Sequence, residues 1–535
     1  MKVAVIGGGI AGLASAALLA ADGHEVDLFE KQDAVGGRAG SHSTGGFRFD
    51  TGPSWYLMPE VFDHFFQLLG TSAAEQLDLR TLDPAYRVFY EGASGEPSPP
   101  RLDITADTAT NVAAFEQVEP GAGQALSTYL DSARDAYDIA LKHFLYTNFT
   151  SPLSLASPDV VSRLPRLLPL LTRTLEQFVG SRFSDVRLRQ VLGYPAVFLG
   201  SSPDRAPSLY HLMSALDLTG GVLYPQGGFT HLIDAVARLA TAHGARIHTA
   251  ATVTAVTTSQ SNRRRGPKER VTGLRWRDGD GGEHAHLADV VVGAGDLHHL
   301  ETRLLPTHLR TYPQSYWDKA QSGPGAVLVL LGVRGELPEL AHHSLFFTHD
   351  WQANFDAIFD GRVPTPASAY VCKPSATDPS VAPEGHENLF ILVPVPSDPE
   401  LGHGGPDGQG SARVEAVADA AIAQIADWAG ISDLADRVVV RHTIGPEDFE
   451  KDLFAWRGGM LGPSHTLKQS AMFRARNQSR HVSGLYYAGS STIPGIGLPM
   501  CLISAELVLK HLRGDTSTGP LPVPGRDAHP REPVS

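Results

Sequence analysis

The stretch Val3-Ala4-Val5-Ile6-Gly7-Gly8-Gly9-Ile10-Ala11-Gly12 decides the fold of this chain. Its apolar, β-branched start is typical of a buried parallel strand, and an Ala- and Leu-rich helix is expected to follow, to about Ala21. A second strand is expected over residues 25–30 and ends in an acid, Glu30. Strand, glycine turn, helix, strand and acid appear in the order that a dinucleotide-binding βαβ unit requires.

Each part of this fingerprint has a physical reason. Gly7 permits the tight turn, Gly9 lets the backbone approach a pyrophosphate, and Gly12 lets the helix pack closely against the strand. The free amides and positive end of the helix N-terminus favour phosphate. Glu30 is placed to accept hydrogen bonds from an adenosine ribose. The alternative is a glycine-rich turn without a ligand, and the fingerprint alone does not separate FAD from NAD.

Length and charge limit the classes of function. A chain of 535 residues is expected to form two or more intertwined lobes. The net charge of -14 argues against nucleic acid as a partner, because phosphate backbones are bound by clustered Lys and Arg. The dense basic run Arg263-Arg264-Arg265, with Lys268, lies between two strand-like segments and is interpreted as a solvated hairpin loop.

Cysteines and histidines give no sign of a metal site. Only Cys372 and Cys501 occur, too few for a disulfide framework, so a reducing cytoplasm is the expected location. The pairs His298-His299 and His342-His343 lie in polar segments without other ligand residues. We therefore expect these histidines at the surface, and no metal site is predicted.

A second glycine-rich segment follows the acid and indicates FAD. Val35-Gly36-Gly37-Arg38-Ala39-Gly40-Ser41 resembles the G-G-R-x-x-S/T segment of flavin amine oxidases and carotenoid desaturases. The resemblance implies that Gly37 passes beside the pyrophosphate and that Arg38 approaches phosphate or flavin. A guanidinium suits this role because it is always charged and donates two hydrogen bonds at once. Lys31, directly after Glu30, is included in the expected FAD site.

The segment Asp50-Thr51-Gly52-Pro53 admits two interpretations. In the resembled families a D-x-G segment at this position runs near the flavin ring, which places Asp50 and Gly52 in the expected cofactor site. Asp50 could instead form a simple turn before Gly52 and Pro53. A turn beside the cofactor would satisfy both interpretations.

The middle of the chain resembles the part of these flavoproteins that returns to the FAD domain. Pro225-Gln226-Gly227-Gly228-Phe229 opens an expected helix, and strands are expected over residues 246–249 and 251–256. The resemblance implies that Val253 lies near the adenine. A small meander of strands is expected around Asp278, and a buried parallel strand at residues 289–293.

The C-terminal part carries the most specific resemblance. A strand ending at Gly489 is followed by Ser491-Thr492-Ile493-Pro494-Gly495-Ile496-Gly497-Leu498-Pro499-Met500, and then by a helix from about Cys501. This run resembles the L-Y-x-x-G-x-x-T-x-P-G-x-G-x-P signature of bacterial-type phytoene desaturases, which belong to the flavin amine-oxidase superfamily. Gly489, Gly495 and Gly497 are therefore included in the expected cofactor site. The resemblance covers the chain from Met1 to about Arg513.

The expected fold class is α/β, with a Rossmann-type FAD-binding domain and an interleaved α+β lobe. Residues 1–80, 220–300 and 440–513 are expected to form the discontinuous FAD-binding domain. Residues 81–219 and 301–439 are expected to form a substrate-binding, membrane-facing lobe. Residues 514–535, rich in Pro, Gly and charge, are expected to be a disordered tail.

The resemblance implies desaturation of a long apolar polyene such as phytoene, towards lycopene or a shorter product. A hydride would leave a saturated carbon for the flavin and a proton would leave its neighbour. No proton-accepting residue can be named, so the flavin itself or water could serve. No second nucleotide fingerprint is present, which favours a quinone or oxygen as electron acceptor.

Two groups of alternatives remain open from the sequence. The first comprises other flavoenzymes on the same scaffold, namely a carotenoid oxidase or ketolase, a retinol saturase or an amine oxidase. The second is a non-catalytic escort-type relative that binds a lipid chain.

The segment Arg163–Phe178 suggests how such an insoluble substrate would be collected. Apolar residues recur there at helical spacing on one face: Leu164, Leu167, Leu168, Leu171, Leu175 and Phe178. Arg163, Arg166 and Arg173 could contact anionic head groups, and Pro169 is expected to kink the helix. Peripheral association with the cell membrane is the hypothesis, and an ordinary core helix of the lobe is the alternative.

Overall fold

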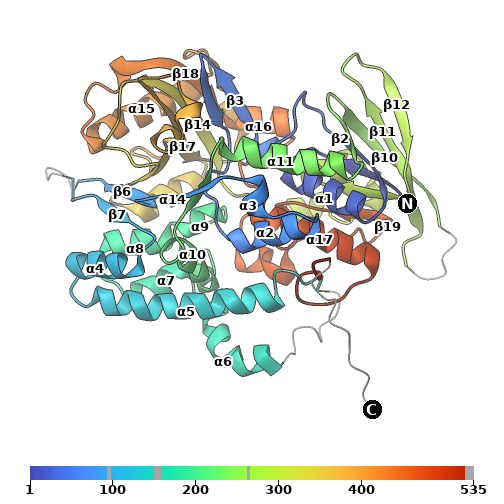
Figure 1. Cartoon of the computed structure of the whole chain (residues 1–535), viewed down its shortest axis with the longest axis horizontal. Helices are drawn as coiled ribbons and strands as arrows, with labels where there is room; N and C mark the ends of the chain where they lie inside the picture. The colour runs from blue at the N-terminus through green and yellow to red at the C-terminus, as the bar shows by residue number, and fades with distance from the viewer. Residues whose placement is uncertain (93–97, 150–157, 262–265, 525–535) are drawn as a thin grey trace.

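The computed structural model describes residues 1–92, 98–149, 158–261 and 266–524. A five-stranded parallel sheet is built from three separated parts of the chain, and its strand β2 is labelled in Figure 1. Its strands are, in spatial order, β20 (Leu485–Tyr487), β13 (Val290–Gly293), β1 (Lys2–Ile6), β2 (Glu25–Phe29) and β9 (Arg246–His248). The predicted βαβ unit is therefore present, and each of the strands expected to join it does so.

The first helix of the fingerprint is buried on almost every side. α1 (Ile10–Ala21) packs against α17 (Leu498–Arg513) and α11 (Gly228–Ala242), and α17 also contacts α2 (Pro59–Leu68). The small Ala side chains of α1 allow this close approach of neighbouring helices. Both ends of the chain thus contribute to one core beneath the glycine turn.

The predicted meander forms a separate antiparallel sheet at the edge of the molecule. Strands β10 (Thr252–Gln260), β11 (Glu269–Arg277) and β12 (Glu283–Leu287) pair in order, and β19 (Val482–Ser483) adds to β11. The connection from β10 to β11 is the predicted hairpin loop. Of its basic run, Arg263, Arg264 and Arg265 lie outside the described residues.

A seven-stranded sheet organises the second lobe (Figure 1). Its order is β18 (Val438–Ile444), β14 (Gly325–Arg334), β17 (His386–Val395), β16 (Ala369–Cys372), β15 (His343–Phe347), β6 (Tyr86–Tyr90) and β7 (Leu102–Ile104). The long apolar strand β14 is buried almost throughout. Residue 440, the expected start of the last cofactor segment, falls inside β18 of this second sheet. The predicted α/β fold class is confirmed.

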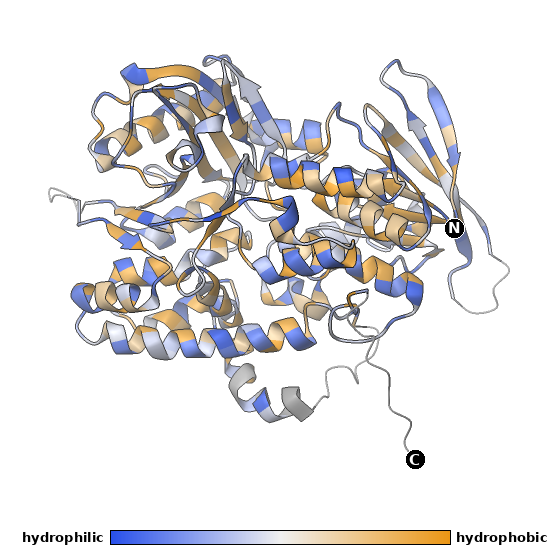
Figure 2. Ribbon diagram, in the orientation of Figure 1, coloured by the Kyte–Doolittle hydropathy of each residue, from blue (hydrophilic) through white to orange (hydrophobic). Residues whose placement is uncertain are grey.

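Helices surround this sheet, and Figure 2 shows hydrophobic residues on its strands, with hydrophobic and hydrophilic residues alternating along α5. The helices of the lobe are α4 (Thr108–Val118), α5 (Ala122–His143), α6 (Pro158–Thr172), α7 (Leu175–Gly180), α8 (Val186–Gly193), α9 (Pro195–Phe198), α10 (Ser214–Asp217), α14 (Trp351–Phe359) and α15 (Ala412–Ala429). By contrast, α12 (Leu297–Arg303) and α13 (Gln314–Trp317) pack in one core with β1 and β13 of the parallel sheet. Smaller elements include α3 (Ala73–Gln76), α16 (Pro446–Leu453), β3 (Ser41–Thr44), β4 (Phe47–Asp50), β5 (Leu79–Thr81) and β8 (Leu223–Pro225).

The segment predicted as one amphipathic helix is in fact two. α6 ends at Thr172 and α7 begins at Leu175, because Thr174 starts a new capping box with Gln177. Phe178 is buried in the core of the lobe, whereas Leu168 and Leu171 are exposed, so the expected single apolar face is wrong. The side chains of Leu164, Arg166 and Leu167 lie outside what the structure describes.

The predicted disordered tail is wrong for its first part. The Lys510 ammonium donates to the carbonyls of Ser517 and Gly519, each at 2.7 Å. Leu521 is buried, and its N–H donates to the Glu506 carboxylate at 2.6 Å. Residues 525–535 lie outside the described parts. None of the helices described combines the length and apolar character needed to cross a bilayer.

Candidate active site

A cavity of about 620 Å³ is lined by residues of both large sheets. Ile6 at the end of β1 lines it on one side, and Leu328 of β14 and Phe390 of β17 line it on the other. It extends from Glu30 and Val253 to the C-terminal loop at residues 489–501. Most of its lining side chains are apolar, as expected for a site that holds a large and largely hydrophobic ligand.

The glycine turn forms one end of the cavity. Gly7 and Gly9 line it, whereas Gly12 does not: a Cβ on Gly12 would lie 1.9 Å from the Gly7 carbonyl oxygen. Gly12 is thus required by helix–strand packing, as predicted. A Cβ on Gly9 would meet no protein atom closer than the Gly36 oxygen at 3.8 Å. Packing does not require glycine at position 9, so its bare backbone leaves room for a ligand.

The acid of the fingerprint is fixed by backbone amides. The Glu30 carboxylate accepts hydrogen bonds from the N–H of Gly8 at 2.6 Å and of Gln32 at 2.8 Å. Lys31 and Val253 also line this part of the cavity. The Lys31 ammonium donates to the Lys451 carbonyl at 2.6 Å, and burial lowers its pKa. These residues lie together at the end of β2, where the ribose end of a dinucleotide is expected.

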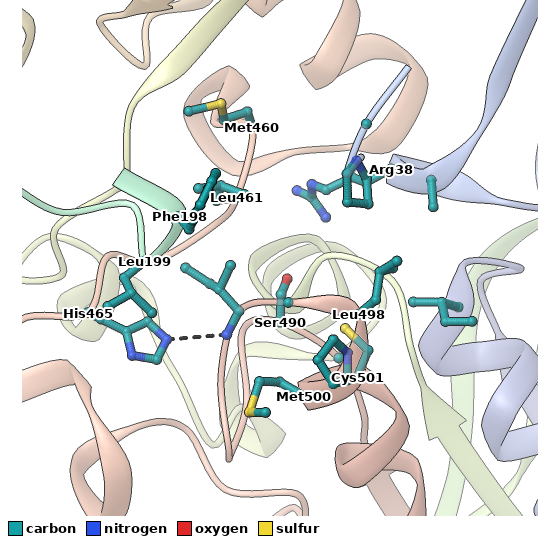
Figure 3. A pocket seen from close by; sticks show the side chains of 18 of the residues that line it. Arg38, Phe198, Leu199, Met460, Leu461, His465, Ser490, Leu498, Met500 and Cys501 are labelled. Atoms are coloured by element: carbon teal, nitrogen blue, oxygen red, sulfur yellow. Dashed lines mark hydrogen bonds between the residues drawn. The ribbon is translucent and has the colours of Figure 1, made fainter. Parts of the chain in front are cut away.

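Arg38 fits a bound anionic group. Its Nε and Nη2 atoms are buried and have no hydrogen-bond partner among the residues that the structure describes, although Nη2 lies 3.8 Å from Asp296. Figure 3 shows the guanidinium beside the cavity. Gly37 and Gly52 also line the cavity, and a Cβ on Gly52 would lie 1.7 Å from the Arg38 carbonyl oxygen. Buried unpaired guanidinium donors are costly, so a phosphate or flavin oxygen is the expected partner.

Asp50 plays neither of its two expected roles directly. It ends β4 and does not line the cavity. Its carboxylate accepts hydrogen bonds from the N–H of Phe229 at 2.7 Å and of Thr230 at 3.2 Å, at the start of α11. Burial raises its pKa, while these bonds oppose the shift. Asp50 therefore anchors the N-terminus of a helix that packs beneath the site.

The C-terminal loop at residues 489–501 also lines the cavity. Gly489 and Gly497 line it, but Gly495 does not. Gly495 has φ +145°, and a Cβ there would lie 2.3 Å from the His465 ring. The expectation that Gly495 itself approaches cofactor or substrate is therefore wrong, because the missing side chain makes room for His465.

His465 is a site residue that the sequence did not reveal. Its Nε2 accepts the Ile496 N–H at 3.2 Å, the bond dashed in Figure 3. Nδ1 therefore carries the proton and donates to the Tyr210 hydroxyl at 2.6 Å. Burial and then the nearby charge of Arg474 hold the pKa of His465 well below its ordinary value. The neutral ring thus fixes the loop at Ile496. In the sequence, the glycine at position 495 is the trace of this contact, because a side chain there would overlap the His465 ring.

Aromatic side chains form one wall of the cavity. Trp55, Tyr194, Phe198, Phe347 and Tyr370 all line the cavity. The Tyr194 hydroxyl donates to the buried Asp217 carboxylate at 2.5 Å, so its polar end is satisfied away from the cavity. Such a wall offers contact area and few hydrogen bonds, which suits an apolar ligand.

The expected surface position of the two histidine pairs is wrong, because His298 and His299 are half-buried and His342 and His343 are fully buried. His299 lines the cavity and stacks on Phe454, with ring centres 3.9 Å apart, and burial lowers its pKa to about 4. His342 and His343 are both buried behind the aromatic wall. Their polar sequence neighbours misled the prediction, because β15 lies inside a seven-stranded sheet.

Comparison with known proteins decides the family. The model of the family described as flavin containing amine oxidoreductase matches residues 10–508. The chain belongs to this family. Members are flavin-dependent oxidoreductases, so this chain is a flavin-dependent oxidoreductase. The predicted superfamily is confirmed.

Similar proteins cover nearly the whole chain. A carotenoid 3,4-desaturase of Haloarcula japonica is 40% identical over 94% of this chain and 96% of its own length. A ζ-carotene-forming phytoene desaturase of Myxococcus xanthus is 33% identical over 96% of this chain and 93% of its own length. A crystal structure of an oxidoreductase from Methanosarcina mazei shares the fold, with a TM-score of 0.60, 19% identity, and coverage of 95% of this chain and 100% of its own.

Proposed function

We propose that this chain is an FAD-dependent carotenoid desaturase, which introduces double bonds into a long apolar polyene in carotenoid biosynthesis. The observation that carries the proposal is the cavity itself, which joins a dinucleotide fingerprint to an aromatic and aliphatic wall. Two relatives spanning nearly the whole chain are named as carotenoid desaturases. An amine oxidase or a non-catalytic lipid binder is not favoured by these relatives.

FAD, rather than a smaller flavin, fits the length of the site. The cavity extends past the glycine turn to Glu30, Lys31 and Val253, where an adenosine would lie. Gly7, Gly9 and Arg38 lie between that end and the C-terminal loop, and suit a pyrophosphate. A flavin ring would then face the loop that contains Gly489 and Gly497.

The protein's part in the reaction is binding and exclusion of water. A bound flavin supplies the hydride acceptor. Trp55, Phe198 and Phe347 hold the polyene by contact area, because such a substrate has no polar group to recognise. The neutral His465, through Ile496, holds the loop against which the reacting carbons would lie. Each desaturation would remove a hydride from one carbon, which the flavin would take, and a proton from its neighbour, which the flavin itself or water would take. A quinone or oxygen would then reoxidise the flavin.

Membrane collection of the substrate is supported by an apolar rim on α6, η10 (Leu467–Gln469) and η11 (Ala471–Phe473). The rim consists of exposed apolar side chains: Leu168, Leu171, Leu467, Met472 and Phe473. Leu171 and Met472 also line the cavity, so the rim lies at its mouth. Lys468 and Arg173 are exposed beside it, whereas Arg163 pairs with Asp135 at 3.0 Å. We infer peripheral association through this rim.

Vesicle flotation tests the rim. The flavin-loaded protein should float with anionic vesicles, and the double variant Leu168→Glu, Phe473→Glu should remain at the bottom. Leu287→Glu is the matched control, because Leu287 is 73% exposed but lies on β12, far from α6 (Figure 1). Equal flotation of the double variant and the wild type would contradict the inference.

Pigment analysis tests the reaction and its substrate. The gene should be expressed in cells that accumulate phytoene, and separately in cells that accumulate neurosporene or lycopene. New pigment with more conjugated double bonds is expected in at least one host. The host in which it appears separates desaturation of phytoene from desaturation nearer the end of the polyene, the two reactions named for the relatives. Unchanged pigment in every host would contradict the proposal.

A further inference from the structure

Behind the aromatic wall lies a cluster of three donor side chains outside the cavity. His342, His343 and Cys372 are all buried, and one donor atom of each lies within 4.8 Å of the others. His343 and Cys372 face each other across the antiparallel pair β15–β16. None of the three lines the cavity.

The hydrogen bonds of the two imidazoles leave one nitrogen of each ring bare. His342 Nδ1 lies 2.8 Å from the Thr377 hydroxyl, and His343 Nδ1 lies 2.7 Å from the Tyr370 hydroxyl. Both Nε2 atoms are buried, and neither has a hydrogen-bond partner in the described parts of the chain. Nδ1 protons donated to these hydroxyls would leave a lone pair on each Nε2. Histidines that bind metals commonly show this arrangement, with the second nitrogen held by an outer hydrogen bond.

We propose that His342, His343 and Cys372 bind a borderline transition-metal cation, of which Zn²⁺ is the representative. Two imidazoles and a thiolate form a donor set that such cations prefer. Burial raises the pKa of the Cys372 thiol to about 12 without a cation, and a bound cation would deprotonate it. The neighbouring Lys373 is occupied by the Leu337 carbonyl at 2.6 Å and by Glu387 at 3.6 Å.

The position of the cluster indicates a structural role. Trp55 stacks on His343 with ring centres 4.6 Å apart and planes 13° apart. The hydroxyl of Ser54 lies 2.5 Å from that of Tyr370, which also contacts His343. Ser54, Trp55 and Tyr370 line the cavity. A cation here would fix the sheet strands β15 and β16, and through them the aromatic wall, without touching the reacting atoms.

The test uses the flavin-loaded full chain and two probes, Zn²⁺ and Co²⁺. Protein dialysed against Zn²⁺ and freed of excess should retain a single zinc ion per chain by elemental analysis. Cys372→Ser should lose it, whereas Cys501→Ser, which alters the other buried cysteine, should keep it. Co²⁺ should give ligand-field absorption bands in the red, beyond the flavin bands, with the intensity of a four-coordinate site.

The cobalt spectrum of the wild type requires no variant, so the proposal stays testable if Cys372→Ser fails to fold. Zinc should also raise the melting temperature of the wild type more than that of Cys372→Ser. A wild type that takes up neither Zn²⁺ nor Co²⁺ would overturn the proposal and assign the two bare Nε2 atoms to a buried water molecule. Equal zinc retention by Cys372→Ser would overturn the assigned ligands.

Discussion

Replacing Arg38 by Met should separate cofactor binding from folding. In the wild type, Nε and Nη2 of Arg38 are buried beside the cavity, without a hydrogen-bond partner among residues 1–92, 98–149, 158–261 and 266–524. The carboxylate of Asp296 lies 3.8 Å from Nη2. Methionine keeps much of the length and apolar volume of the side chain but removes both donors.

The expected loss of affinity follows from these two donors. A hydrogen bond to a charged group contributes about 1.5–3 kcal/mol, so two bonds to the cofactor contribute about 3–6 kcal/mol. The attraction to Asp296 already offsets part of the burial cost in the free protein, which favours the lower end. A loss of about 3 kcal/mol weakens flavin binding by roughly 100-fold.

The apoprotein should respond in the opposite direction. Because Nε and Nη2 have no hydrogen-bond partner among the described residues, Arg38→Met breaks no hydrogen bond of these two atoms. The substitution also removes two buried donors, each of which costs about 1–3 kcal/mol when it is unpaired. Its free energy of unfolding should therefore not fall. The Asp296 carboxylate still accepts hydrogen bonds from the N–H of His299 and of Trp456, both at 3.2 Å.

Flavin titration of the apoprotein, followed by fluorescence quenching, measures the affinity, and urea denaturation of the same samples measures stability. Arg80→Met is the control, because Arg80 lies exposed on β5 and forms an ion pair with the exposed Asp78. Wild-type affinity in Arg38→Met, or lower affinity explained by an unstable apoprotein, would refute the assignment of Arg38 to the cofactor.

Three further changes test other parts of the site. Gly9→Val should abolish flavin binding and leave the apoprotein's melting temperature unchanged, since a Cβ there meets only the Gly36 oxygen at 3.8 Å; full flavin occupancy after purification would disprove this. Gly495→Ala should destabilise the protein by about 1–3 kcal/mol in urea denaturation, because φ is +145° and the Cβ would lie 2.3 Å from His465. Adding His465→Ala should restore part of that loss, and wild-type stability of Gly495→Ala would contradict the geometry. Burial raises the pKa of Asp217 from 3.8 to about 6, so its contribution to stability is present below pH 3.8 and is lost as the pH rises through about 6. Asp217→Asn should therefore flatten the fall of the unfolding free energy between these two pH values. An unchanged curve would show that Asp217 does not cause this fall.

Local sequence was sufficient for the glycine turn because its residues interact with near neighbours. The role of Gly12 depends on the Gly7 carbonyl five residues away, and Glu30 reaches Gly8 within one βαβ unit. Short apolar runs beside glycine turns likewise placed strands of the parallel sheet, such as β1 and β13. The placement of Gly9 and Arg38 at the cavity also followed from motif order alone.

Partners distant in sequence could not be predicted. Asp50 anchors α11 through Phe229, and His465 occupies the space beside Gly495, yet neither pairing leaves a periodic pattern. Polar neighbours in the sequence suggested that His342 was exposed, although it is buried beside the seven-stranded sheet. By contrast, the helix break at Thr174 had a readable signal, because Thr174 and Gln177 form a capping box.

The most direct test of the proposed function is reduction of the bound flavin by a polyene. The purified yellow protein would be mixed anaerobically with vesicles carrying phytoene, neurosporene or lycopene, while flavin absorbance is followed and the pigments are extracted. With its own substrate, the flavin should bleach at the rate at which a product with an additional double bond appears. A flavin that stays oxidised with every polyene, but bleaches with an amine, would contradict the account.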